Sequence, residues 1–442
     1  MEDGPEGSLS GDRRGRPMFL KSLKIRDLRS LPSVDLEFST LDDEREIRKW
    51  SLLVGENGTG KSTILKSIAL VLAGSECIPF LLGQPKAWVR QGAHRAVIGA
   101  TLRTAAGETR EVELVIRADD EPSDTYKRNS ETLSRLDDAV RHAQQNYFVV
   151  GYGPYRRVGD TGSMIQESSL RPQRAQSVQT LFDRNAVVNP LSSWAISLHY
   201  ERGDEGLEIV REALDALLPG VSFNTIDRKT RTLLFRTADG TFPLEDLSDG
   251  YQNIAVWIGD LLYRVTSAFA HFKRPLEARG LLLIDEVDAH LHPAWQRRLR
   301  EFLNNKLPNF QIVATTHSAL TLQQAHEGDA TVLSRNSDGE VRAADFPGDP
   351  SKLRLHQLYD LAFRITSLDS WEIEQAKDVY RALANRPEED MAADERVEFA
   401  IAKQTLEQLP TSRDDALGNP VLQEFFRKMD DVTAALGRSV QR

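Results

Sequence analysis

The feature that most constrains this chain is the run GENGTGKS, from Gly55 to Ser62. It follows a short apolar segment, residues 50–54, and opens a helical pattern that ends near Gly74. A complete G-x-x-x-x-G-K-S pattern between a strand and a helix indicates a phosphate-binding loop, in which backbone N–H groups and the helix N-terminus face the anion. We expect Lys61 to contact the terminal phosphates and Ser62 to bind Mg²⁺. A glycine-rich surface turn is the alternative, and it leaves the flanking strand and helix unexplained. The candidate nucleotide-binding residues are Gly55, Glu56, Asn57, Gly58, Thr59, Gly60, Lys61, Ser62 and Thr63.

A second candidate element is LLLIDE, residues 281–286, an apolar strand that ends in two carboxylates. Two acids at a strand end are usually only solvated. Beside a phosphate loop they are expected to be functional, because a bound Mg-nucleotide needs a carboxylate partner. We expect Asp285 to hold the magnesium and Glu286 to polarise the attacking water as a general base.

Two further segments add candidates. LSDGYQ, residues 247–252, precedes a helical pattern and by itself predicts only a helix N-cap. TTHS, residues 315–318, ends the apolar strand QIVATTHS. The carboxyl ends of parallel strands gather on one edge of a sheet, where ligands bind, so we expect His317 to lie near the phosphates.

The remaining patterns divide the chain into three expected parts. Residues 1–17 are rich in Gly, Pro and charge, which is typical of a disordered leader. Residues 18–350 hold the strand and helix patterns of a nucleotide-binding domain, with an inserted lobe at about 75–200. After the break FPGDP, residues 351–442 are expected to form a helical region, whose last helix has an apolar face at three- and four-residue spacing over residues 422–436.

Composition excludes several classes of protein. The 442 residues include 56 Lys and Arg against 66 Asp and Glu, and a net charge of −10 argues against a generally basic nucleic-acid coat. The single cysteine, Cys77, excludes an intramolecular disulfide and a cysteine zinc site, and we expect it to be a small buried hydrophobe. No apolar run reaches the roughly 18 residues that span a bilayer, and the first residues lack a signal core. We therefore expect a cytoplasmic protein without a membrane partner.

The order of these motifs resembles that of the ATP-binding-cassette (ABC) ATPases, in their soluble branch with Rad50, SMC, RecF and OLD-type ATPases. A more specific resemblance, to the AAA15/AAA21-like bacterial ATPases, rests on IDEVDAHLHPAWQRRLREFL, FQIVATTHS and YGPYRR. The resemblance implies an α/β fold of the P-loop NTPase, ABC-ATPase type. Its mixed sheet core carries an antiparallel β lobe and a helical insertion, and a C-terminal helical region follows.

The resemblance also implies roles for the candidate residues. Ser248 and Gly250 would contact the γ-phosphate held by another protomer. Asp285 would be the magnesium carboxylate, Glu286 the catalytic glutamate and His317 the switch histidine. No glutamine can be assigned to the family's Q-loop.

Two more assignments follow from the resemblance. The opening KIRDLRS is similar to the family's N-terminal strand and turn, which implies that Arg29 lies near the nucleotide. HLHP matches the family's D-loop, so His290 and His292 are expected at a dimer contact rather than at a metal.

The function implied is binding and hydrolysis of ATP with Mg²⁺ by a head-to-tail dimer or higher oligomer. The chain would act as sensor and regulator of a separately encoded effector, a nuclease or a toxin, in bacterial anti-phage defence, as the standalone ATPases of Septu, PARIS and retron modules do. The alternative is a RecF- or Rad50-like DNA-repair ATPase that acts directly on DNA. Residues 62–247 hold no sustained heptads, which excludes a coiled-coil clamp, and residues 351–442 lack the Asp-x-Asp strand ending of an OLD-type nuclease domain.

One group of arginines could contact nucleic acid or another phosphate, so nucleic acid stays open as a partner. A solvated loop is the other interpretation of this group, and the sequence does not decide between the two. Its members are Arg156, Arg157, Arg171, Arg174 and Arg184.

Overall fold

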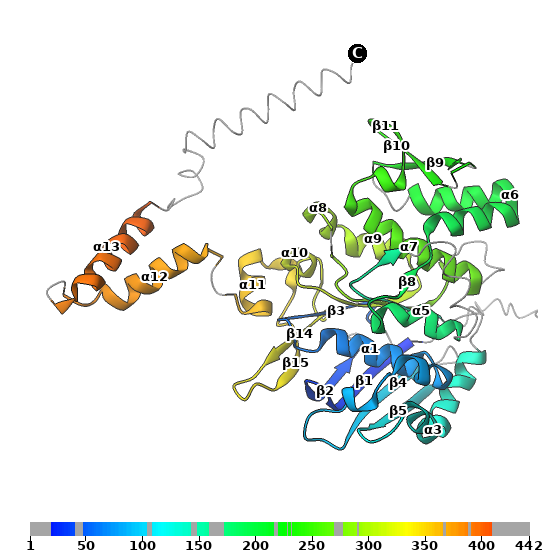
Figure 1. Ribbon diagram of the computed structural model, residues 1–442, viewed down its shortest axis with the longest axis horizontal. Coiled ribbons are helices and arrows are strands. Elements are labelled where there is room, and N and C mark those ends of the chain that lie inside the picture. Colours follow the sequence, from blue (N-terminus) through cyan, green and yellow to red (C-terminus); the bar gives the residue numbers. More distant parts are fainter. Residues whose placement is uncertain are drawn as a thin grey trace, which may run out of the picture. The chain divides into compact units, whose positions relative to one another are not determined.

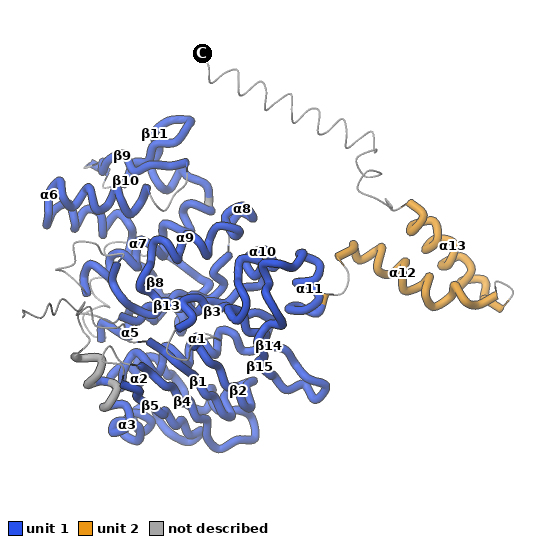
Figure 2. The backbone as a smooth tube through the Cα atoms, turned by 180° about the vertical axis from the view of Figure 1, so that it is seen from behind, with its two compact units in different colours: residues 1–364 blue, residues 365–442 orange. Residues whose placement is uncertain are grey.

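The computed structural model describes residues 19–39, 47–103, 108–142, 148–158, 172–215, 220–227, 229–230, 232–268, 277–289, 291–365, 368–387 and 390–408. The predicted leader (1–17) and the predicted last helix (422–436) lie outside these ranges. The chain forms two compact units, residues 1–364 and 365–442 (Figure 2).

A six-stranded sheet forms the centre of the first unit, in the order β15-β14-β3-β13-β12-β6. Five neighbouring strands run parallel, and β15 is antiparallel at one edge. The strands are β3 (Trp50–Gly55), β6 (Phe148–Tyr152), β12 (Gly280–Ile284), β13 (Phe310–Thr315), β14 (Ala330–Arg335) and β15 (Val341–Asp345). Since β3, β12 and β13 are neighbours, their carboxyl ends meet at one edge.

Both faces of this sheet are covered, which explains why its strands are apolar throughout. Alternate residues belong to two separate cores: Leu282 and Ile284 face one, and Leu281 and Leu283 face the other. Helix α1 (Lys61–Leu72) is buried nearly all round, because it lies between the central sheet and a second, antiparallel sheet (Figure 1).

The second sheet has the order β2-β1-β4-β5. It consists of β1 (Phe19–Leu28), β2 (Leu31–Glu37), β4 (Arg95–Arg103) and β5 (Thr109–Arg117). Alternation of apolar and polar residues in 95–103 and 111–117 predicts a hairpin, and β4 and β5 form one, whose first strand pairs with β1. Helix α3 (Pro122–His142) packs on β5 and begins inside a polar stretch whose composition is typical of a loop. Short elements join α1 to β4: η1 (Ser75–Cys77), α2 (Ile78–Leu81) and η2 (Pro85–Ala87).

The other core lies under a lobe of helices and short strands. Helices α6 (Leu191–Asp215) and α7 (Asp249–Ala268) pack together, and α6 is interrupted by a non-helical Gly203. The lobe also holds β7 (Arg157–Val158), β8 (Val187–Val188), β9 (Ser222–Asp227), β10 (Thr232–Thr237), β11 (Gly240–Pro243) and η4 (Leu244–Asp246). Helix α5 (Gln173–Phe182) packs on β6 and α1 and belongs to the core that contains α1.

Short helices lie between the core strands β12, β13 and β14, and further helices follow β15. The first unit contains α8 (Pro293–Gln296), α9 (Leu299–Lys306), α10 (Ala319–Leu322), η6 (Pro350–Lys352) and α11 (Leu355–Phe363). Helix α11 buries Leu358, Ala362 and Phe363 in the core of that unit. The second unit contains α12 (Trp371–Leu383) and α13 (Ala393–Glu407), which pack against each other. No helix in the described ranges is long and apolar enough to cross a lipid bilayer.

Candidate functional site

The loop between β3 and α1 has the backbone of a phosphate loop. Gly55 has a φ of 138°, and a Cβ there would lie 2.1 Å from the carbonyl oxygen of Leu333 on the neighbouring strand. Gly60 has a φ of 92°, and its Cβ would lie 2.6 Å from the Leu31 side chain. Only glycine fits both positions without displacing a neighbour, which accounts for their place in the sequence pattern.

The N-terminus of α1 is open to an anion. Its cap residue, Gly60, makes no side-chain capping bond, and no acidic residue lies in the first turn. The first N–H groups of a helix need external partners, and this helix supplies none of its own. The Thr59 hydroxyl turns inward and donates to the Glu56 carbonyl at 2.8 Å, whereas Ser62 is exposed. These features fit a bound polyphosphate.

Lys61 is folded back onto the loop that precedes it. Its Nζ donates to the carbonyl oxygens of Gly55 and Glu56, both at 2.8 Å, and the residue is only 5% exposed. Burial lowers the pKa of this ammonium to about 8, against the opposing effect of the nearby carboxylates of Asp285 and Glu286. A terminal phosphate would replace the two carbonyls as its partner.

The two carboxylates after β12 differ in environment. Asp285 is 5% exposed, and its Oδ1 accepts a 2.6 Å hydrogen bond from the hydroxyl of Thr315 on β13. Glu286 is exposed and has a left-handed backbone, with a φ of 49°. The same Thr315 hydroxyl accepts from the Glu286 N–H at 2.8 Å, so one side chain orients both acids. A buried carboxylate oxygen suits Mg²⁺, and an exposed carboxylate beside it suits proton transfer.

Arg156 lies beside the same turn. Its Nη2 donates to the carbonyl oxygens of Asp285 at 2.9 Å and Glu286 at 2.8 Å. Burial lowers the pKa of this guanidinium to about 10, partly offset by Asp285, Asp288 and Glu286, so that it is charged at neutral pH.

The end of β13 brings a third group to this edge. His317 follows the buried residues Thr315 and Thr316, and partial burial together with the Lys61 charge lowers the pKa of its imidazole. The Thr316 hydroxyl donates to Asp288, and burial raises the pKa of that carboxyl. The histidine is therefore neutral at pH 7 and available as a hydrogen-bond partner.

Arg29 lies in the turn between β1 and β2, which packs on the phosphate loop. Its guanidinium stacks on Trp88 at 4.1 Å from the ring centroid, and Nε donates to the Ala87 carbonyl at 3.1 Å. Burial lowers its pKa. The adjacent Ser30 hydroxyl would lie 3.2 Å from a Cβ on Gly60, so this turn borders the candidate site.

Ser248 and Gly250 do not belong to the sheet edge. They lie where η4 gives way to α7, and the Ser248 carbonyl accepts from the N–H groups of Tyr251 and Gln252. The Ser248 residue itself is exposed. Both predicted residues thus sit at the N-terminal end of a long helix rather than beside Lys61.

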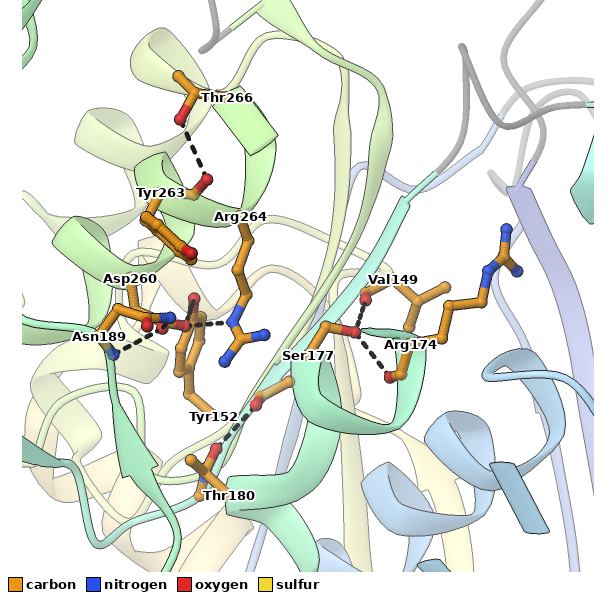
Figure 3. A network of polar contacts seen from close by, with 12 residues as sticks. Val149, Tyr152, Arg174, Ser177, Thr180, Asn189, Asp260, Tyr263, Arg264 and Thr266 are labelled. Atoms are coloured by element: carbon orange, nitrogen blue, oxygen red, sulfur yellow. Dashed lines mark hydrogen bonds and ion pairs between the residues drawn. The ribbon is translucent and has the colours of Figure 1, made fainter. Parts of the chain in front are cut away.

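A buried polar network connects α7 to the sheet (Figure 3). Asp260 is 0% exposed, and it accepts hydrogen bonds from the Tyr152 hydroxyl at 2.9 Å, from Arg264 Nε at 2.6 Å and from two nitrogens of Asn189 at 2.9 and 2.6 Å. Four donors thus satisfy one buried carboxylate. Tyr152 ends β6, and its carbonyl accepts from the Asp285 N–H at 2.8 Å.

The structure adds two residues that sequence reasoning did not assign to the site. Thr315 stood out only as part of TTHS, and Arg156 only as one of a group interpreted as a solvated loop or a nucleic-acid contact. For Arg156 the solvated-loop interpretation is wrong, because its guanidinium holds two backbone carbonyls. The sequence feature that could have identified Arg156 is the YGPYRR segment at the end of β6. It points to the turn of Asp285 and Glu286 only because β6 lies beside β12.

The structure describes two of the three remaining residues, His292 and Cys77. His292 caps α8, where its Nδ1 accepts from the Ala294 N–H at 3.2 Å, and His290 lies outside the described residues. No metal-binding group of three or more His, Cys, Asp or Glu occurs among the residues that the structure describes. Cys77 is buried as expected, and burial raises the pKa of its thiol to about 12.

The chain is similar to several known proteins. The chain is 27% identical over 327 residues to the Septu protein PtuA of Bacillus mycoides, which covers 74% of this chain and 42% of that protein. It is 23% identical to PtuA of Bacillus thuringiensis, over 75% of this chain and 79% of that protein. The chain thus spans less than half the length of the first relative. Among solved structures, an Smc head domain from Pyrococcus furiosus bound to the C-terminal domain of ScpA aligns with a TM-score of 0.43 and 15% identity, over 74% of this chain and 96% of that one.

A family model described as "AAA domain, putative AbiEii toxin, Type IV TA system" matches residues 51–323. The matched region begins in β3 and contains the phosphate loop, both carboxylates and the TTHS segment. It covers more than half of the 442 residues, and the chain belongs to this family of P-loop ATPases.

Proposed function

We propose that two copies of this chain bind ATP and Mg²⁺ between them and hydrolyse the ATP with Glu286 as general base. The observation that carries the proposal is the convergence of Lys61, Asp285 and Glu286 at the carboxyl edge of three neighbouring parallel strands. An open helix N-terminus beside a buried carboxylate and an exposed one matches what phosphoryl transfer to water requires.

Each group has a distinct part in the proposed reaction. Lys61 exchanges the carbonyls of Gly55 and Glu56 for the terminal phosphates. Ser62 and Asp285 would hold Mg²⁺, which supplies charge neutralisation of the phosphates when bound. Glu286 takes a proton from the attacking water, and neutral His317 orients the γ-phosphate by a hydrogen bond.

Ser248 and Gly250 are proposed to complete the site of a second copy. They are exposed or half-exposed at the N-terminus of a 20-residue helix, where N–H groups and the helix dipole favour an anion. In a two-fold pair, the same two surfaces would build both sites. Closure would then depend on ATP, because the phosphate lies between the two chains.

We further propose that this closure regulates a separately encoded effector, a nuclease or a toxin, in anti-phage defence. The similarity to Septu PtuA proteins supports this role. The C-terminal helical region, residues 351–442, is the proposed docking region. Within it, α12 and α13 expose Trp371, Val397 and Ile401, at 73%, 59% and 59% of their surface.

The experiment is to purify the tagged full chain from cells that also express its neighbouring genes. The tagged chain carries Glu286→Gln, and ATP is present throughout, so that the closed pair is trapped. We expect one neighbouring gene product to co-purify in a defined ratio. A truncation after Arg364 leaves the first unit whole, including the core helix α11, and should abolish that capture. Capture of duplex DNA in place of a protein would support the DNA-repair alternative instead.

A further inference from the structure

The turn that carries Glu286 has an unusual backbone. Glu286 adopts a left-handed conformation with a φ of 49°, which is strained for a non-glycine residue. Such a conformation persists only where the surroundings fix it. The direction of the Glu286 carboxylate depends on it, since the backbone sets where the side chain begins.

The backbone polar groups of Asp285 and Glu286 all have partners. The Asp285 N–H donates to the Tyr152 carbonyl at 2.8 Å, and the Glu286 N–H donates to the Thr315 hydroxyl at 2.8 Å. The Ala289 N–H reaches the Glu286 carbonyl at 3.0 Å from within the following turn. Among the described residues, Arg156 is the side chain that holds both carbonyl oxygens, through a single nitrogen.

Arg156 is itself firmly anchored. Its Nε donates to the Gly153 carbonyl at 3.3 Å, and a Cβ on Gly153 would lie 2.2 Å from the Thr180 carbonyl, so this segment packs directly on α5. Just before it, the Tyr152 side chain is fixed in the Asp260 network (Figure 3). The arginine therefore links a rigid strand end to the turn of the proposed catalytic base.

The chemistry of the side chain suits this task. A guanidinium is planar and presents its N–H groups in fixed directions, so Nη2 holds the two carbonyl oxygens in one fixed geometry, whereas a lysine ammonium rotates freely on its flexible stem. Its positive charge also lies beside Asp285, Glu286 and Asp288, where an unpaired cluster of carboxylates would repel itself.

We propose that Arg156 is a positioning residue for hydrolysis, which holds the peptide units of Asp285 and Glu286 so that the Glu286 carboxylate meets the attacking water. The inference rests on the proposed ATP hydrolysis. Arg156 acts through Glu286 and leaves binding of the nucleotide to the phosphate loop. Its loss should consequently lower kcat with little change in KM.

The test compares Arg156→Gln, Arg156→Lys and, as matched control, Arg157→Gln, which alters the exposed neighbour. We expect Arg156→Gln to lower kcat about 100-fold, the loss typical of a misplaced catalytic group, with KM within about twofold of wild type. Arg156→Lys should retain an intermediate kcat, and Arg157→Gln should match wild type. The ATP-induced rise in Tm should be the same in wild type and in all three variants.

A chemical rescue separates positioning from a structural role. Millimolar guanidinium should raise the kcat of Arg156→Ala and leave wild type unchanged. If Arg156→Gln does not fold, Arg156→Lys and this rescue carry the test. A wild-type kcat in Arg156→Gln, or loss of its ATP-induced Tm shift, would overturn the positioning role while hydrolysis by Glu286 stands. A wild-type protein that binds ATP without hydrolysing it would overturn the proposed function and this inference together.

Discussion

Thr315 and Asp285 are joined by a 2.6 Å hydrogen bond that ties the ends of two neighbouring strands together. The hydroxyl donates to Asp285 Oδ1 and accepts from the N–H of Glu286, so a single buried side chain sets both acids. Oδ1 of Asp285 is thereby hydrogen-bonded within the protein. Thr315 thus orients the two carboxylates that the sequence motifs single out.

Replacing Thr315 by valine should impair both stability and hydrolysis. Valine keeps the shape but leaves the Glu286 N–H and Asp285 Oδ1 without a partner, at a cost of about 1–3 kcal/mol in the free energy of unfolding. We expect a lower urea midpoint and a kcat reduced about tenfold or more. Thr315→Ser keeps the hydroxyl and should retain most of both. Equal behaviour of the two variants would show that the hydroxyl has no such role.

The Asp260 network should dominate the stability of the interface between α7 and the sheet. Asp260→Ala leaves the buried Arg264 guanidinium without its carboxylate partner and should lower the free energy of unfolding by about 4 kcal/mol. Tyr152→Phe removes one of four donors and should lower it by about 1 kcal/mol. Glu208→Ala, in the exposed pair with Arg211, serves as control and should change stability by under about 1 kcal/mol. Urea unfolding measures all three. A cost for Asp260→Ala no greater than that of the control would contradict the network's importance.

The main features of the site could be predicted because they depend on local pattern and on one topological rule. An apolar strand followed by GENGTGKS specifies the phosphate loop, and the rule that parallel strands share a carboxyl edge brings Asp285, Glu286 and the TTHS segment to it. The proximity of Lys61 to both carboxylates agrees with that expectation.

What could not be predicted depends on pairing between distant segments. Arg156 reaches the turn of Asp285 and Glu286 only because β6 lies beside β12, and nothing local specifies that neighbour. Likewise, the pattern of residues 95–117 predicts a hairpin but not its pairing with β1. The start of α3 is hard to predict for a local reason: Pro122 stands at the first helical position, which proline favours, within a polar stretch that resembles a loop.

Mixing two inactive variants tests whether each site is shared between chains. Lys61→Ala and Ser248→Ala should each be nearly inactive alone. Their heterodimer has one site with both residues intact, so a 1:1 mixture should recover about a quarter of the wild-type rate. Lys61→Ala mixed with Glu286→Gln is the control, because both changes affect the same half of a site and should restore nothing. Wild-type hydrolysis by Ser248→Ala alone would exclude the shared site.

The pH dependence of hydrolysis should report His317. Partial burial and the Lys61 charge lower the pKa of His317 below its usual 6.5, so the ring is neutral at pH 7 and gains a proton only as the pH falls below that value. We expect kcat to fall on the acid side, below about pH 6.5, as the neutral ring is lost. His317→Gln should have a lower kcat without that acid limb. The same limb in both proteins would assign it to another group.

The most direct measurement is the rate of ATP hydrolysis by Glu286→Gln beside its affinity for ATP. In the proposed reaction, Glu286 acts on the attacking water, whereas Lys61 contacts phosphate charge that is already present in the ground state. Glu286→Gln should therefore bind ATP as tightly as wild type and hydrolyse it at least about 100-fold more slowly, whereas Lys61→Ala should lose binding. Near-normal turnover by Glu286→Gln would contradict the assignment of Glu286 as the general base.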